Sequence, residues 1–134
     1  MSISVEWDNE QHTIVRWIFD RRWTWDEFSA AQKESNQLLE KVDHPVDVIG
    51  DLRNSSGLPA NALTAYRGLV AETATNVDLI VLVGASRFVK AMVSVFLRVM
   101  PGKTPGTHFV FADTLERAYT LIAEHQAKRE SKDL

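Results

Sequence analysis

Side chains able to bind an anion follow two of the strands predicted for this 134-residue chain. A guanidinium and two hydroxyls come after the strand predicted at 46–52, and a hydroxyl and a second guanidinium come after the strand predicted at 77–83. The carboxyl ends of parallel strands meet at one edge of a sheet, where open α/β folds bind their ligands. We therefore predict an anion-binding site formed by Arg53, Ser55, Ser56, Ser86 and Arg87.

Ser86 adds a second reason for this site, because it stands where a helix is predicted to begin. Free backbone N–H groups and the helix dipole favour negative charge at that position. The alternative is that Ser86 and Asp113 act only as helix caps and that Arg53 and Arg87 are solvated charges. The sequence leaves both interpretations open.

The sequence shows no recognisable catalytic or metal-binding pattern. Cysteine is absent, which excludes disulfides, thiol catalysis and thiolate metal sites. Asp51 ends a strand, as the phosphoacceptor of a receiver domain does, but no acidic pair ends the first strand and no lysine closes the fifth. No nucleophile elbow or glycine-rich phosphate loop is present. We predict no enzymatic activity, no metal and no cofactor, and we expect surface or strand-end positions for the histidines at 12, 44, 108 and 125.

Composition sets wide bounds on the class of protein. Apolar residues make up 45% and charged residues 25%, the mixture typical of a globular domain, so we predict one domain over residues 1–134. The net charge of −3 disfavours nucleic-acid binding. No apolar run reaches the roughly 18 residues that a membrane span needs, and the first ten residues do not resemble a secretion signal. The expected location is the cytoplasm.

The N-terminal third of the chain predicts a hairpin followed by a helix. Apolar and polar residues alternate over 3–7 and over about 12–19, with a polar turn between them, which is typical of two antiparallel strands. The helix is predicted to run from a capping box to about residue 42. Thr24 and Glu27 form that box, and Trp23 with Phe28 has the spacing of a hydrophobic staple.

The rest of the chain alternates strands and helices. We predict strands at 46–52, 77–83 and 108–112, the middle one buried on both faces because it is almost continuously apolar. Helices are predicted from Pro59 to about Thr73, from Ser86 to about residue 100, and after a second capping box of Asp113 and Glu116. The charged tail, residues 124–134, is expected to fray.

These elements occur in the order ββαβαβαβα. Alternating strand and helix units favour a mostly parallel sheet with right-handed crossovers. We predict an α/β fold with a five-stranded mixed sheet and four helices, in which the first strand runs antiparallel at one edge.

This order resembles the anti-anti-sigma-factor (STAS) superfamily. In that family a phosphorylatable serine opens a D-S-S-G-L segment at the start of a helix that follows a strand. The segment Ser55-Ser56-Gly57-Leu58 is similar to it, with Asn54 in place of the aspartate. The segment 109–112 and the helix after it also resemble uncharacterised bacterial relatives of this fold. The resemblance implies an anti-anti-sigma-like fold, phosphorylation at Ser55 and a regulatory protein as partner.

The third predicted helix carries an unusually wide apolar surface. Arg87, Lys90, Ser94 and Arg98 share one narrow face, and apolar side chains cover an arc of roughly 200°. Either neighbouring helices cover the flanks of this arc or part of it meets a partner. We predict an interface that includes Phe88, Met92, Val95, Phe96 and Val99, with Trp17 contributing if its face of the sheet is uncovered.

The leading hypothesis is a non-enzymatic regulatory or protein-interaction module that forms a homodimer. The alternative is a domain that binds a small apolar or lipid-like molecule beside the third helix, with an anionic end near Arg53, Ser86 or Arg87. An enzyme using Asp51, Arg53 and a serine ranks last, because no base and nucleophile pair can be identified.

Overall fold

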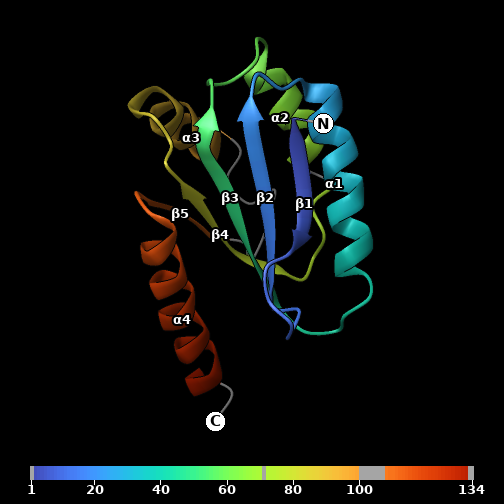
Figure 1. Cartoon of the computed structure of the whole chain (residues 1–134), viewed down its shortest axis with the longest axis vertical. Helices are drawn as coiled ribbons and strands as arrows, with labels where there is room; N and C mark the ends of the chain where they lie inside the picture. Colours follow the sequence, from blue (N-terminus) through green and yellow to red (C-terminus); the bar gives the residue numbers. More distant parts are fainter. Residues whose placement is uncertain (1, 71, 100–107, 133–134) are drawn as a thin grey trace.

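The computed structural model describes residues 2–70, 72–99 and 108–132 of the chain. Five strands form one sheet and four helices pack against it (Figure 1), which confirms the predicted α/β class and element order. The elements are β1 (Ile3–Trp7), β2 (Ile14–Arg21), α1 (Trp25–Leu39), β3 (Val46–Ser55), α2 (Ala62–Val70), β4 (Val77–Val83), α3 (Arg87–Val99), β5 (His108–Ala112) and α4 (Leu115–Lys132).

The strands lie side by side in chain order. β1 is antiparallel to β2, and β2, β3, β4 and β5 are parallel to one another, so the predicted antiparallel edge strand is confirmed. The crossovers from β2 to β5 are right-handed and each leads to the next strand in the same direction across the sheet. The three crossover helices α1, α2 and α3 therefore lie on one face of the sheet. The last helix, α4, packs on the opposite face against β3, β4 and β5 (Figure 1).

The face under α1 has an aromatic core. Trp17 and Phe19 of β2 pack against Phe28 of α1, with ring centroids 5.0 and 6.1 Å away, and Trp23 lies 5.8 Å from Phe28. The last contact is the predicted staple. The capping box is also confirmed, since the Thr24 side chain accepts the Glu27 backbone N–H and the Glu27 side chain accepts the Thr24 N–H. These contacts fix α1 against the hairpin.

The face under α4 has an aliphatic core. Ile49, Val81 and Val83 of the sheet are fully buried against Ala118 and Ile122 of the helix. The strand β4 was predicted to be buried on both faces, but only its α4 face is fully buried. On the other face Val77 is buried, whereas Ile80 and Leu82 are half-buried and border a cavity described below.

Two predictions about the C-terminal segment are wrong. The helix α4 continues through Lys132 instead of fraying from residue 124. Its N-cap is Thr114, whose Oγ1 accepts the Arg117 N–H at 3.1 Å, and not Asp113. Because α4 begins at Leu115, Thr114 occupies the cap position, and the exposed Asp113 instead pairs with Lys90 at 3.5 Å.

Several element boundaries also differ from those predicted, and β2 runs over Ile14–Arg21 rather than about 12–19. β3 continues to Ser55 because Asn54 and Ser55 pair with the last two residues of β2. The helix α2 begins at Ala62 rather than Pro59, directly after Asn61, whose φ of 62° marks a turn. The helix α1 ends at Leu39, three residues earlier than expected.

Candidate functional site

A pocket of about 260 Å³ lies at the carboxyl ends of β3 and β4, beside the start of α3. Four of the five residues predicted to bind an anion line it, namely Arg53, Ser55, Ser56 and Ser86. Arg87 does not line the pocket. The gathering of these residues follows from the parallel pairing of β3 with β4, which brings the two strand ends together.

Two of the three serine hydroxyls that line this pocket, those of Ser55 and Ser86, have partners within the chain. Ser55 Oγ accepts the Trp23 indole N–H at 3.0 Å and donates to the Gly57 carbonyl at 3.2 Å. Ser86 Oγ accepts the Val89 backbone N–H at 3.2 Å and so caps α3. Ser55 is the last residue of β3 and stands seven positions before α2 begins, not at a helix start. Phosphorylation at Ser55 remains a prediction.

Arg53 joins the pocket to a network of charged residues on the α4 face. Its guanidinium donates to both carboxylate oxygens of Asp51, at 2.9 and 2.8 Å, and Arg16 donates to the same carboxylate at 3.1 Å. The hydrogen bonds from Arg53, followed by those from its backbone and from Arg16, outweigh the cost of burial and lower the pKa of Asp51 to about 2. Asp51 is therefore a structural anion whose two arginine partners hold it ionised.

Gly84 fixes the position of the Arg53 side chain. Its φ is 72°, and a Cβ at this position would lie 2.6 Å from Arg53 Cγ. The turn after β4 therefore needs glycine both for its backbone conformation and for the close approach of the arginine stem.

The exposed side of α3 carries an apolar stripe beside a basic one. Phe88 is 63% exposed and Val95 is 39% exposed, and the half-buried Met92 lies on the same side of the helix. Arg87 and Arg98 are exposed beside this stripe. The helix contains three basic residues and no acidic residue, in a chain whose net charge is −3.

Two of the other predicted interface residues, Phe96 and Trp17, are buried. Phe96 is 4% exposed and stacks on Tyr66 of α2, with ring centroids 5.1 Å apart. Trp17 is 8% exposed and belongs to the core under α1, not to an uncovered face of the sheet. The side chain of Val99 lies outside the described residues.

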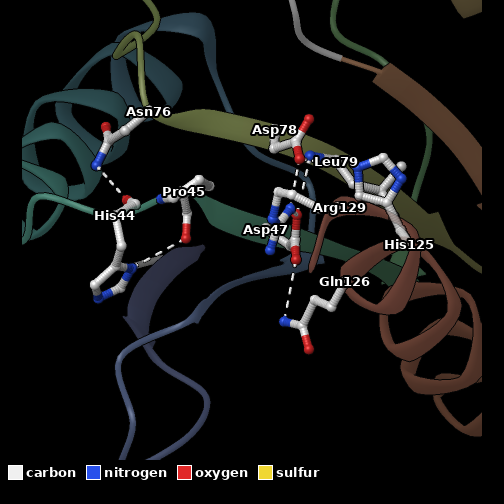
Figure 2. A network of polar contacts seen from close by, with 9 residues as sticks. All are labelled: His44, Pro45, Asp47, Asn76, Asp78, Leu79, His125, Gln126 and Arg129. Atoms are coloured by element: carbon white, nitrogen blue, oxygen red, sulfur yellow. Dashed lines mark hydrogen bonds and ion pairs between the residues drawn. The ribbon is translucent and has the colours of Figure 1, made fainter. Parts of the chain in front are cut away.

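A second charged cluster fastens α4 to the sheet (Figure 2). Asp47 of β3 is fully buried, and its carboxylate accepts the Leu79 backbone N–H at 3.1 Å and the Gln126 side chain at 3.2 Å. Asp78 of β4 accepts from His125 Nε2 at 2.9 Å. The Arg129 guanidinium pairs with both carboxylates. Burial raises the pKa of Asp78, but the hydrogen bonds from Arg129 and His125 more than offset it, and the net shift is downward.

This cluster is also a geometric candidate for a cation site. One ligand atom from each of Asp47, Asp78 and His125 lies within 4.8 Å of the others. However, Arg129 already supplies the positive charge that the two carboxylates need, which makes the cluster an ion-paired clamp between helix and sheet. His125 of α4 therefore lies beside two carboxylates, a contact that no local motif in the sequence predicted. The spacing of residues in the sequence could not predict this contact, because Asp78 and Asp47 are 47 and 78 residues away from His125 in the chain.

One signal for this clamp was present in the sequence. Asp47 and Asp78 each stand second in a strand that is otherwise mostly apolar. A carboxylate in a buried strand requires a partner, since an isolated charge is too costly to bury. The position of these two aspartates predicts that each carboxylate has a partner, but it does not predict which residue that partner is.

No protein-family model matches this sequence, and no curated protein matches it. None of the described helices is long and apolar enough to cross a membrane.

Proposed function

We propose that this chain is a non-enzymatic interaction module whose α3 surface binds an acidic, partly apolar segment of a regulatory protein. The observation that carries the proposal is the exposure of Phe88, at 63% the largest among the described large apolar side chains. A phenylalanine left in water on a helix is a common feature of binding sites, because aromatic side chains contribute much of the energy of protein interfaces.

The charge of α3 favours an acidic partner. The exposed Arg87 and Arg98 lie together on one side of the stripe of Phe88, Met92 and Val95, and no acidic residue on the helix offsets them. A partner segment with apolar residues every three or four positions and carboxylates beside them would match both stripes. A second copy of the chain would instead bring two sets of cations together if the two α3 helices met directly.

The proposal can be tested with two synthetic helical peptides that share one leucine stripe. One peptide carries glutamates beside the stripe and the other carries lysines. We expect the glutamate peptide to bind, with titration calorimetry or fluorescence anisotropy as the measurement. Phe88→Ser should weaken binding at least tenfold, and Arg98→Glu should also weaken it.

Glu124→Ala on the exposed surface of α4 is the matched control and should leave binding unchanged. Equal binding of the two peptides, or binding insensitive to Phe88→Ser, would contradict the proposal. Sedimentation velocity on the same variants tests the homodimer. A dimer that Phe88→Ser dissociates would show that a second copy occupies this surface, and that result would also overturn the acidic-partner proposal.

A further inference from the structure

A separate cavity lies between the sheet and the helices α1 and α2. Its volume is about 170 Å³. Its apolar wall comes from four strands and α1 and includes Trp17, Phe28, Val48, Ile80, Leu82 and Phe109. A cavity of roughly 150 Å³ lined by aliphatic and aromatic side chains is large enough to bind benzene. The space under α1 is therefore large enough for a single-ring molecule.

Glycine at position 50 keeps the floor of the cavity open. Gly50 lies in the middle of β3 and is itself part of the lining. A Cβ at this position would lie 2.8 Å from Leu82 Cδ2, the end of a flexible side chain, and 4.0 Å from Phe19 Cε1. The φ of Gly50 is not in the left-handed region, so backbone conformation does not require glycine here. The missing side chain instead leaves room beside Leu82.

One wall of the cavity is polar and uncharged. Gln32, Ser35 and Asn36 of α1 line it, and they share one face because they stand three and four residues apart. Ser35 is 3% exposed, and its Oγ accepts the Trp17 indole N–H at 3.3 Å, which leaves the hydroxyl hydrogen able to donate. No charged side chain is found among the described residues of the lining.

The polar side of the cavity is partly exposed. Asn36 of α1, Tyr66 of α2 and Thr73 line the cavity and are each partly exposed, whereas Ser35 and Trp17 are buried. A molecule entering from this side would pass the polar row of α1 before its apolar part reached the strands.

We infer that this cavity binds a small, neutral, mostly apolar ring compound that carries one hydroxyl or carbonyl group. Its ring would lie between Trp17, Ile80 and Phe109, and its polar group would meet the hydroxyl of Ser35. A charged ligand is disfavoured because an unpaired charge is costly to bury and the wall offers no countercharge. The sequence suggested an apolar ligand beside α3 with an anionic end at Arg53, whereas this site lies under α1 and includes neither. The inference does not depend on the partner proposed for α3.

Three probes of similar shape test this inference on the full chain, namely p-cresol, toluene and p-toluate. We expect p-cresol to bind with a Kd of about 0.1–1 mM, in line with the ligand efficiency of small molecules. Toluene should bind severalfold more weakly, and p-toluate should not bind. The measurements are quenching of tryptophan fluorescence and chemical-shift changes at Trp17, Ile80 and Phe109.

Two variants of β3 distinguish this cavity from other binding sites. Gly50→Ala should reduce p-cresol binding at least tenfold, because the new methyl group and the displaced Leu82 side chain fill the space. Ile49→Val removes a methylene on the opposite face of the same strand and should leave binding unchanged. Ser35→Ala should lower the affinity for p-cresol to that of toluene without changing toluene binding.

The circular dichroism spectrum and Tm of each variant confirm that it is folded. The inference is overturned if p-cresol does not bind to the wild-type chain. Binding that survives Gly50→Ala in a folded variant would also overturn it, as would p-toluate binding as tightly as p-cresol. None of these outcomes depends on peptide binding at α3, so the two proposals can fail separately.

Discussion

On the face under α1, four aromatic rings pack with centroids 5.0 to 6.1 Å apart, whereas the core under α4 is aliphatic and is bordered by a buried ion-paired cluster. The helix α1 is thus held largely by apolar packing, which involves no charged groups and is therefore not weakened by charge screening or by protonation. The helix α4 depends in addition on carboxylates that must stay ionised. The same sheet therefore stabilises its two sides by contacts that respond differently to solution conditions.

The largest expected effect is the loss of an aromatic ring from the α1 face. Phe19→Ala removes a side chain that is 5% exposed and contacts three other rings. We expect a decrease of about 3–5 kcal/mol in the free energy of unfolding, measured by urea denaturation, and the same decrease at low and high salt. The milder Phe19→Leu should cost less than about 1.5 kcal/mol if the alanine variant does not fold. A strong salt dependence of this decrease would contradict the conclusion that apolar packing holds this face together.

Removing the cation of the clamp should have the next largest effect. Arg129→Met leaves Asp47 and Asp78 without their guanidinium, and we expect a cost of about 2–3 kcal/mol in the free energy of unfolding. Hydrogen exchange should increase over the last turns of α4 and much less in α1. Lys128→Met, at an exposed position of the same helix, is the matched control. If both variants were equally stable, the clamp would not be what holds α4.

Acid should weaken the α4 face more than the α1 face. The pKa of Asp51 is about 2 in the folded chain against an ordinary value of 3.8, so the folded state favours the ionised carboxylate. Its contribution, on the order of 2 kcal/mol, is present above about pH 4 and is lost as pH falls toward 2. The lowered pKa of Asp78 acts in the same direction.

Denaturation at several pH values between 2 and 6 measures this loss. Asp51→Asn should be less stable at neutral pH and should show a smaller loss of stability between pH 4 and 2. Asp113→Asn is the control, because that carboxylate is 91% exposed. An unchanged acid dependence in Asp51→Asn would contradict the role given to its arginine partners.

The smallest expected effect concerns a contact between α4 and the hairpin. Tyr119 Oη donates to Asp8 Oδ1 at 2.8 Å, across 111 residues of chain. Tyr119→Phe removes this hydrogen bond from a partly exposed position and should cost about 0.5–1 kcal/mol in the free energy of unfolding. A loss comparable to that of Arg129→Met would mean that α4 depends on the hairpin as much as on β3 and β4.

Local signals in the sequence were sufficient for much of the fold. The capping box of Thr24 and Glu27 and the staple of Trp23 and Phe28 depend on residues within five positions, and both are present. The order of strands and helices also predicted that Arg53 and Ser86 would share one pocket, because parallel strands end at the same edge. Arg53 and Ser86 bond to residues two and three positions away, whereas the Trp23 indole that bonds to Ser55 lies 32 residues away and could not be predicted from local spacing.

Contacts between distant segments were beyond prediction from the sequence. The pairing of Arg129 with Asp47 spans 82 residues and turns a charged tail, which was expected to fray, into an ordered helix. The cavity under α1 depends on how α1, α2 and four strands pack together, which no spacing of residues indicates.

The sequential order of the strands has a consequence for how the chain can fold. Each of β2, β3, β4 and β5 pairs with the strand that precedes it, so the sheet can lengthen one unit at a time as the polypeptide leaves the ribosome. The helix α4 differs from the other three helices because it covers the opposite face of the sheet, against β3, β4 and β5. Since α4 is made after all five strands, we expect its docking to be the last step, leaving that surface of β3 to β5 uncovered until α4 has been made.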